Sequence, residues 1–302
     1  MRSPGTDAGG KRSAGRATAI GASAILMWAT LALLTTMTGR VPPFQLTALA
    51  FAIAFIATLI SWILRRGSII RHFQWPWRAW LVGVGGLFGY HFFYFLALRT
   101  APPAEANLVN YLWPLLIVLF ASLLPGHRLR WWHMAGAVAG LAGSALLIAP
   151  THGPIFLAEH AVGYAAALTC AVTWAAYSVI SRRFAHVSTE AVGAFCGATA
   201  LLAGISHLLF EQTIWPRDGE WLAVVAMGLG PVGAAFFAWD IGMKQGDIRA
   251  LGVCGYLTPL LSTALLVMFG RAAPSWVLAA AALLIAGGAA LASRDLFASP
   301  EA

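Results

Sequence analysis

The sequence predicts an all-α polytopic membrane protein, with ten transmembrane helices arranged as two five-helix inverted repeats. An apolar composition, ten apolar segments of spanning length and an internal repeat support this fold class. Of the 302 residues, 60% are hydrophobic and 10% are charged, whereas soluble domains carry about 25% charged residues. This composition excludes an ordinary soluble enzyme, a disordered protein and a disulfide-rich secreted module.

A helix needs about 20 mostly apolar residues to cross a bilayer. Clusters of Gly, Pro or Arg separate the apolar segments, and no connection is long enough for a soluble domain. The predicted spans are 17–38, 44–64, 79–98, 104–124, 131–149, 161–181, 190–210, 220–242, 250–269 and 275–292. The first run is too long for the apolar region of a signal peptide, which has roughly 7–15 residues.

These spans define the domain organisation. The first repeat covers 17–149, an outer connecting loop covers 150–160, and the second repeat covers 161–293. Residues 1–16 and 294–302 are expected to be cytoplasmic tails, the first of them mobile.

The basic residues predict the orientation. With a cytoplasmic N-terminus, only four of the 19 Lys and Arg residues fall outside, and the remaining 15 lie inside. The four outer residues are Arg40, Arg99, Arg217 and Arg271. This asymmetry follows the positive-inside rule and places both termini in the cytoplasm. The net charge of +8 then reflects topology and attraction to anionic lipid, and not nucleic-acid binding.

An internal repeat relates the two halves at an offset of about 145 residues. The string YLWPLL at 111–116 recurs as YLTPLL at 256–261. Further pairs at this offset, or one residue beyond it, are Gly83 with Gly228, Phe92 with Phe237, Trp131 with Trp276, and Trp28 with Trp174. Because each unit holds five helices, the second copy enters the membrane from the opposite side. Inverted repeats are typical of secondary transporters, although a channel can also have them.

Ionisable residues are rare inside the predicted spans. His91 is the one deep titratable group, and it either faces a cavity or packs as a hydrogen-bonded core residue. Asp240 and Lys244 are four residues apart on one helix face, which favours a local ion pair over a role in proton coupling. Cys170, Cys196 and Cys254 lie in apolar runs and are interpreted as small buried side chains.

The fourth and ninth spans each contain a proline at the corresponding position. Asn107, Asn110 and Pro114 share one helix face, and Pro114 frees a backbone carbonyl near Asn110. Pro259 does the same near Gly255 in the second half. Paired breaks predict hinges beside a central site, although the prolines could also only kink their helices.

Aromatic residues supply the second signal for a site. Tyr90 and Tyr94 flank His91, while Trp174 and Tyr177 are three residues apart and precede Ser178. Trp239 lies deep in the eighth span. Rings with a few amides suit an organic solute that has an apolar or aromatic side chain. For any single ring, packing between helices is an equally good explanation.

At this point the chain resembles a known family. VNYLWP at 109–114, TWAAYS at 173–178, AWDIG at 238–242 and GYLTP at 255–259 are similar to the drug/metabolite transporter superfamily of EamA type. They are closest to its bacterial aromatic amino acid exporters of YddG type. The resemblance implies alternating-access export of amino acids, aromatic and other neutral ones, across the bacterial inner membrane.

The resemblance also implies a central cavity between the third, fourth, sixth, eighth and ninth helices. The substrate-binding candidates carried onto this chain are Tyr90, His91, Tyr94, Asn107, Asn110, Tyr111, Trp113, Trp174, Tyr177, Ser178, Trp239 and Tyr256. Similar exporters have Asn where this chain has Asp240, which leaves the role of Asp240 open.

Two other function classes stay open on the sequence alone. One is a carrier for a different small amphipathic metabolite or drug. The other is a membrane-embedded lipid enzyme, which the lack of a catalytic constellation disfavours. We expect no catalytic residue, metal or cofactor, and a monomer in the bilayer whose partner is its amino acid substrate. Transport is expected to be facilitated, with proton coupling through His91 as the alternative.

Overall fold

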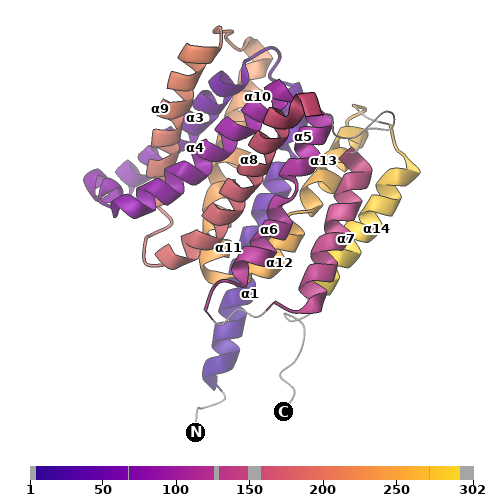
Figure 1. Cartoon of the computed structure of the whole chain (residues 1–302). Coiled ribbons are helices and arrows are strands. Elements are labelled where there is room, and N and C mark those ends of the chain that lie inside the picture. Colours follow the sequence, from indigo (N-terminus) through magenta and orange to yellow (C-terminus); the bar gives the residue numbers. More distant parts are fainter. Residues whose placement is uncertain (1–4, 67, 126–128, 149–157, 272, 293–302) are drawn as a thin grey trace.

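The computed structural model describes residues 5–66, 68–125, 129–148, 158–271 and 273–292, with side chains from residue 13 on except at residue 148. The described part of the chain is helical, without strands. Long helices run side by side between two ends of one bundle, as Figure 1 shows. We call the end where α1 begins and α14 ends the terminal end, and the opposite end the distal end.

Most of the helices are long, and the short ones lie where a span is broken or where two spans are connected. In order they are α1 (Gly5–Ala29), α2 (Leu31–Thr36), α3 (Pro43–Leu64), η1 (Ile69–Phe73), α4 (Trp77–Thr100), α5 (Pro103–Asn110), α6 (Trp113–Ala121), α7 (Trp131–Ile148), η2 (Ala158–His160), α8 (Ala161–Ile180), η3 (Ser181–Phe184), α9 (Ala191–Phe210), α10 (Asp218–Leu229), η4 (Gly230–Ala234), α11 (Ala235–Gln245), α12 (Ile248–Cys254), α13 (Leu257–Met268) and α14 (Trp276–Ala292).

Eight helical stretches among the described residues are long and apolar enough to cross a membrane, and Trp276–Ala292 is a shorter apolar helix. The chain is therefore a membrane protein. The observed helix ends lie close to the predicted ones, except that α1 already begins at Gly5, inside the predicted tail. The predicted loop 150–160, apart from its last three residues, and the tail 294–302 lie outside the described residues.

The two halves of the chain are intermingled. Each of the four most extensive helix pairs joins one helix from the first half to one from the second: α1 with α11, α3 with α9, α4 with α8, and α7 with α14. Figure 1 shows α3 and α9 on one side of the bundle and α7 with α14 on the other.

The fourth and ninth predicted spans are both broken near their prolines. The α-helix stops at Asn110 and resumes at Trp113, just before Pro114. In the second half it stops at Cys254 and resumes at Leu257, just before Pro259. Proline lacks an N–H and its ring clashes with the preceding turn, so each interruption falls within the turn before it. The breaks lie at equivalent positions of the repeat.

Two further interruptions were not anticipated from the sequence. One breaks the first predicted span at Thr30, between α1 and α2, and the other lies in the eighth span. The predicted span 220–242 contains a π-helical turn, Gly230–Ala234, between α10 and α11. Pro231 removes one donor from the ladder there, and the indole Nε1 of Trp28 donates a hydrogen bond of 3.0 Å to its carbonyl oxygen. Trp28 thus ties the last turn of α1 to the irregular backbone between α10 and α11.

The terminal end is tightly packed. The side chains of Trp239, Met243 and Leu251 are fully buried. Gly21 on α1 and Gly242 on α11 lie so close that a Cβ built on either would be under 3 Å from the other's Cα atom. Only glycine permits this approach of two helix backbones.

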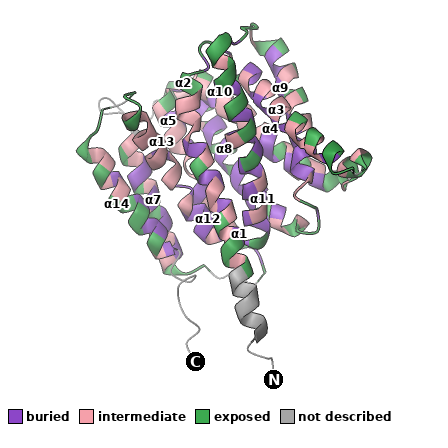
Figure 2. Ribbon diagram, turned by 180° about the vertical axis from the view of Figure 1, so that it is seen from behind, coloured by how far each residue is buried: buried purple, intermediate pink, exposed green. Residues whose placement is uncertain are grey.

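The distal half is more open. Nine consecutive residues of α4, 88–96, are all half-buried, as are eight of α13, 260–267. Nine residues cover every side of a helix. Both the membrane-facing and the interior side of α4 therefore have accessible surface there. Figure 2 shows the contrast with the buried residues along α8 and α11.

Candidate functional site

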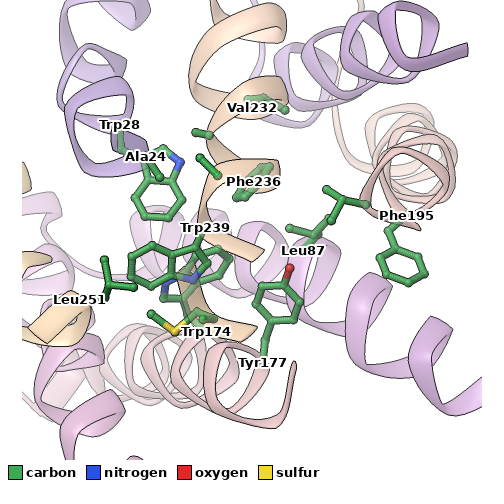
Figure 3. Packing of buried hydrophobic residues seen from close by; sticks show 14 of the residues in the cluster. Ala24, Trp28, Leu87, Trp174, Tyr177, Phe195, Val232, Phe236, Trp239 and Leu251 are labelled. Atoms are coloured by element: carbon green, nitrogen blue, oxygen red, sulfur yellow. The ribbon is translucent and has the colours of Figure 1, made fainter. Parts of the chain in front are cut away.

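Aromatic rings from five spans meet at the centre of the bundle. Trp28, Tyr90, Trp113, Trp174, Tyr177, Phe236 and Trp239 form what we call the central aromatic cluster. The rings of Trp28 and Trp239 are 5.0 Å apart, and those of Trp28 and Trp174 are 5.5 Å apart. Figure 3 shows Trp28 projecting from α1 toward Trp239 and Trp174.

The remaining members join this core from neighbouring helices. The ring centre of Tyr90 on α4 lies 5.3 Å from that of Trp174, and the ring centre of Trp113 on α6 lies 6.0 Å from that of Trp239. Tyr177 packs 5.3 Å from Trp174, and its ring rests against Gly86 of α4. Aromatic pairs at these distances add packing energy and also present flat apolar faces to a solute.

Three rings of the cluster, those of Trp28, Tyr90 and Trp239, form hydrogen bonds with residues beside it. Trp239 Nε1 donates a hydrogen bond of 3.0 Å to Ser178 Oγ on α8, and both side chains are buried. Buried indole N–H groups need such a partner. Ser178 Oγ therefore serves as the acceptor that orients Trp239.

Two tyrosine–amide pairs link α4 to α5. The Tyr94 hydroxyl donates to Asn107 Oδ1 at 2.8 Å, and Asn110 Nδ2 donates to the Tyr90 hydroxyl at 3.2 Å. Asn107 Nδ2 also donates to the Pro103 carbonyl oxygen. Asn110 differs, because its buried Oδ1 has no hydrogen-bond partner among the described residues. A buried acceptor of this kind is available to a donor on a solute.

His91 lies at the edge of the central aromatic cluster, next to Tyr90 on α4. Its Nδ1 bonds the Leu87 carbonyl oxygen at 2.7 Å, so Nδ1 carries the proton. Its ring packs against Phe51 and Phe236, with ring centres 5.2 Å and 6.4 Å away. No carboxylate contacts His91 among the described side chains.

Two of the predicted site residues belong to a different part of the core. Tyr111 and Tyr256 pack in a second cluster with residues of α7 and α14, including Ile285. The ring of Tyr256 lies against Gly140 of α7 and is fully buried. The structure therefore brings ten of the twelve predicted binding residues together around α4, α5, α6, α8 and α11. Tyr256 lies apart from them, whereas Tyr111 packs on the second cluster and is still within electrostatic range of Tyr90 and Tyr94.

Asp240 and Lys244 form a buried ion pair near the terminal end. Asp240 Oδ2 is 2.8 Å from Lys244 Nζ and accepts a hydrogen bond of 2.6 Å from Thr189 Oγ1. Lys244 Nζ also donates to the Val187 carbonyl oxygen at 2.9 Å. The pair joins α11 to the segment between η3 and α9, on the side of the cluster nearer the terminal end.

Sequence reasoning missed three ring residues that contact the site. Trp28 was noted as the counterpart of Trp174 but was not among the candidates, and Phe51 and Phe236 were not singled out. Phe51 and Phe236 are stacked, with 5.6 Å between ring centres. The internal repeat could have identified Phe236, because the offset of about 145 residues makes it the equivalent of His91.

The described residues contain no group of His, Cys, Asp and Glu able to hold a metal ion. The three cysteines form no disulfide; Cys170 and Cys196 are buried, and Cys254 is half-buried. The site offers aromatic rings, the unpaired amide oxygen of Asn110 and accessible surface along α4. Such a surface can bind an organic solute, and it lacks the paired acid–base or nucleophilic groups that catalysis requires.

Comparison with known proteins places this geometry in context. The EamA-like transporter family matches the chain twice, over residues 16–149 and 161–294. The aromatic amino acid exporter YddG of Ancylobacter novellus is 59% identical over 278 residues, covering 92% of this chain and 96% of that protein. The Salmonella typhimurium protein of the same name is 26% identical over 261 residues, covering 83% and 87%.

A solved crystal structure is also closely similar. It superposes with a TM-score of 0.89 at 56% sequence identity and covers 94% of this chain and 99% of the other.

Proposed function

The chain belongs to the EamA-like transporter family, and from this premise we propose that it exports aromatic and other neutral amino acids. Its family and relatives are transporters and not enzymes. The observation that carries the proposal is the central aromatic cluster beside the unpaired Asn110 Oδ1. The exporter name of a relative 59% identical to this chain over most of its length supports the substrate class.

We propose that ten spans form two inverted five-helix repeats over 17–149 and 161–293. The eight long stretches, the 18-residue α7 and the shorter α14 supply ten helices. The double family match and the equivalent breaks near Pro114 and Pro259 support duplication. The repeat makes α11 the equivalent of α4, and α8 the equivalent of α1. The pairs α4–α8 and α1–α11 are therefore equivalent to each other, and the helices of both pairs are in extensive contact.

Contacts between repeat-related residues support a two-fold axis through the site. Trp28 contacts its equivalent Trp174, and His91 contacts its equivalent Phe236. Residues that an axis exchanges can touch only where they lie close to that axis. The candidate site is therefore where two halves of opposite orientation meet, as in transporters with inverted repeats.

In this proposal the solute's side chain stacks on the central aromatic cluster, and its ammonium group donates to Asn110 Oδ1. Tyr90 holds the Asn110 amide in place through its hydroxyl. Tyr94 and Asn107 brace the neighbouring turn of α5. Tyr111, Trp113 and Tyr256 flank the breaks, and Pro114 and Pro259 serve as hinges about which the half-helices move.

The conformation fits one stage of an alternating-access cycle. The terminal end is closed around Trp239, Met243 and Leu251, while the interior side of α4 is accessible in the distal half. With the basic residues placing the terminal end in the cytoplasm, this is a state open to the outside of the bacterial inner membrane. Export then requires the terminal end to open and load solute.

We propose facilitated export by a monomer, without proton coupling. Asp240 is already bound to Lys244 and Thr189, which disfavours it as a proton carrier. His91 is the remaining candidate. If His91→Gln abolished pH-driven uptake of tryptophan while keeping counterflow exchange, His91 would be the coupling residue.

A flux panel in proteoliposomes tests the function. Labelled tryptophan, labelled threonine and a cationic dye are offered to the same reconstituted protein. We expect saturable flux of tryptophan, slower flux of threonine and none of the dye. Flux of the dye with none of either amino acid would replace the proposal with a drug carrier, and turnover of lipid would replace it with an enzyme.

A further inference from the structure

A groove on the membrane-facing side of α3 and α9 lies away from the central aromatic cluster. It has a volume of about 740 Å³, within the range of about 300–1,000 Å³ typical of small-molecule sites. Its lining is almost wholly apolar and includes Ala48, Ala52, Phe55, Gly197 and Ala198. Ile56, Leu201 and Leu208 are exposed at its rim, so the groove opens toward the lipid and not toward the interior.

The groove is long enough to hold a single acyl chain. Its lining on α9 extends from Ala194 to Leu208, which at 1.5 Å per residue corresponds to about 21 Å. This covers most of the hydrocarbon thickness of one bilayer, about 30 Å. Phe73 and Trp80 close it near the terminal end.

The end of the groove at Phe73 and Trp80 carries a concentration of positive charge. Trp80 Nε1 donates to the Phe73 carbonyl oxygen, which joins η1 to the start of α4. Arg71 and Arg78 each precede one of these two rings by two residues, and both are exposed. Arg66 is also exposed nearby in the chain, and residues 65–80 contain no Asp or Glu.

These arginines are available to an external anion. Arg65 pairs with Glu190, which also contacts His72. Arg66, Arg71 and Arg78 form no ion pair with any side chain that the structure describes. Exposed Ile70 and Trp77 lie among them, as expected where a segment rests at the headgroup level.

We propose that this groove binds one anionic phospholipid, with an acyl chain between α3 and α9 and its phosphate on Arg71 and Arg78. The apolar lining matches the chain, and unpaired cations at one end match the headgroup charge. A second copy of this chain would bring the same arginines together without offsetting their charge. The inference rests on membrane insertion and not on the proposed export function.

The test compares dioleoyl phosphatidylglycerol with dioleoyl phosphatidylcholine, each added to the full-length protein purified in detergent. Native mass spectrometry counts bound lipid, and the thermal unfolding midpoint reports stabilisation. We expect the unaltered protein to retain one phosphatidylglycerol in preference to phosphatidylcholine. R71Q/R78Q should weaken phosphatidylglycerol binding about thirtyfold, since two basic residues at a membrane surface contribute about that factor.

Matched controls separate this site from general attraction to the protein's positive end. R128Q/R130Q removes two arginines that precede α7 in the sequence. The helix α7 itself lies on the opposite side of the bundle from α3 and α9 (Figure 1). Ala198→Phe fills the groove with the arginines intact, while Ala279→Phe adds the same ring to exposed α14. We expect loss of binding in R71Q/R78Q and Ala198→Phe, and retention in both controls. Equal binding of the two lipids, or equal loss in R128Q/R130Q, would overturn the proposal.

Discussion

At the scale of single residues, Asn110 is the most informative side chain of the candidate site. It donates to the Tyr90 hydroxyl, while its buried Oδ1 stays without a partner among the described residues. If Oδ1 accepts from the solute ammonium, Asn110→Ala should lower tryptophan affinity about 10–100-fold, as for a lost hydrogen bond to a charged group. Equilibrium binding of labelled tryptophan to protein in detergent measures this.

Asn107→Ala is the matched control for that prediction. It also removes a tyrosine–amide hydrogen bond on α5, but both polar atoms of Asn107 are already satisfied, by Tyr94 and by Pro103. We expect a smaller loss of affinity. Equal losses in the two variants would argue that the amides only brace α4 against α5.

Lys244 is the second residue whose role can be tested singly. Lys244→Met leaves the Asp240 carboxylate buried without its cation, and breaking a buried pair in this way costs about 3–5 kcal/mol. The double change D240N/K244M removes both charges and should recover most of the loss. Unfolding of each variant in denaturing detergent measures the free energies, and a double variant as unstable as the single one would contradict the prediction.

At the scale of elements, the contact of α1 with α11 depends on two glycines. A Cβ on Gly242 would lie 2.6 Å from the Gly21 Cα atom, so Gly242→Ala must push the helix backbones apart. We expect a loss of about 1–3 kcal/mol, typical of overpacking, read as a lower thermal unfolding midpoint. Gly85→Ala, on α4, meets no atom within 4 Å and should leave the midpoint unchanged or raised.

The broken helices show how far element structure follows from sequence. Pro114 and Pro259 stand at equivalent places in two similar strings, so interruptions of the fourth and ninth spans could be anticipated. The π-helical turn at Gly230–Ala234 could not, because its counterpart in α4 is regular and its carbonyl is satisfied by Trp28, 203 residues away in the chain. A local pattern carries no information about such a partner.

At the scale of the whole molecule, closure of the terminal end can be trapped covalently. A Cβ built on Gly246 would lie 2.9 Å from Thr18 Oγ1, close enough for a disulfide between T18C and G246C in a background without the native cysteines. It would also lie 2.7 Å from the Gly242 carbonyl oxygen, so the backbone at residue 246 must shift slightly to admit the new side chain. If this end must open for loading, oxidation should abolish tryptophan flux in proteoliposomes, and reductant should restore it. The single cysteine variants are controls, and undiminished flux in the oxidised double variant would contradict alternating access.

The candidate site illustrates both the reach and the limit of sequence reasoning. Tyr90, Trp174 and Trp239 were chosen because they lie deep in apolar spans, and they meet in the central aromatic cluster. Tyr111 and Tyr256 were chosen by the same criterion, yet they pack against α7 and α14. Depth in the membrane can be estimated from position in a span, but the direction of a side chain at a broken turn depends on the neighbouring helix.

The sequence by itself determined that the chain enters a membrane, is duplicated and breaks near two prolines. Each of these follows from hydropathy, similarity at one offset and proline stereochemistry, which act locally along the chain. Only the tertiary structure decided that Trp28 joins the site, that Asp240 pairs with Lys244 and accepts a hydrogen bond from Thr189, and that the terminal end is closed. Those outcomes depend on contacts between helices from opposite halves, where packing and hydrogen bonding select one partner among many apolar faces.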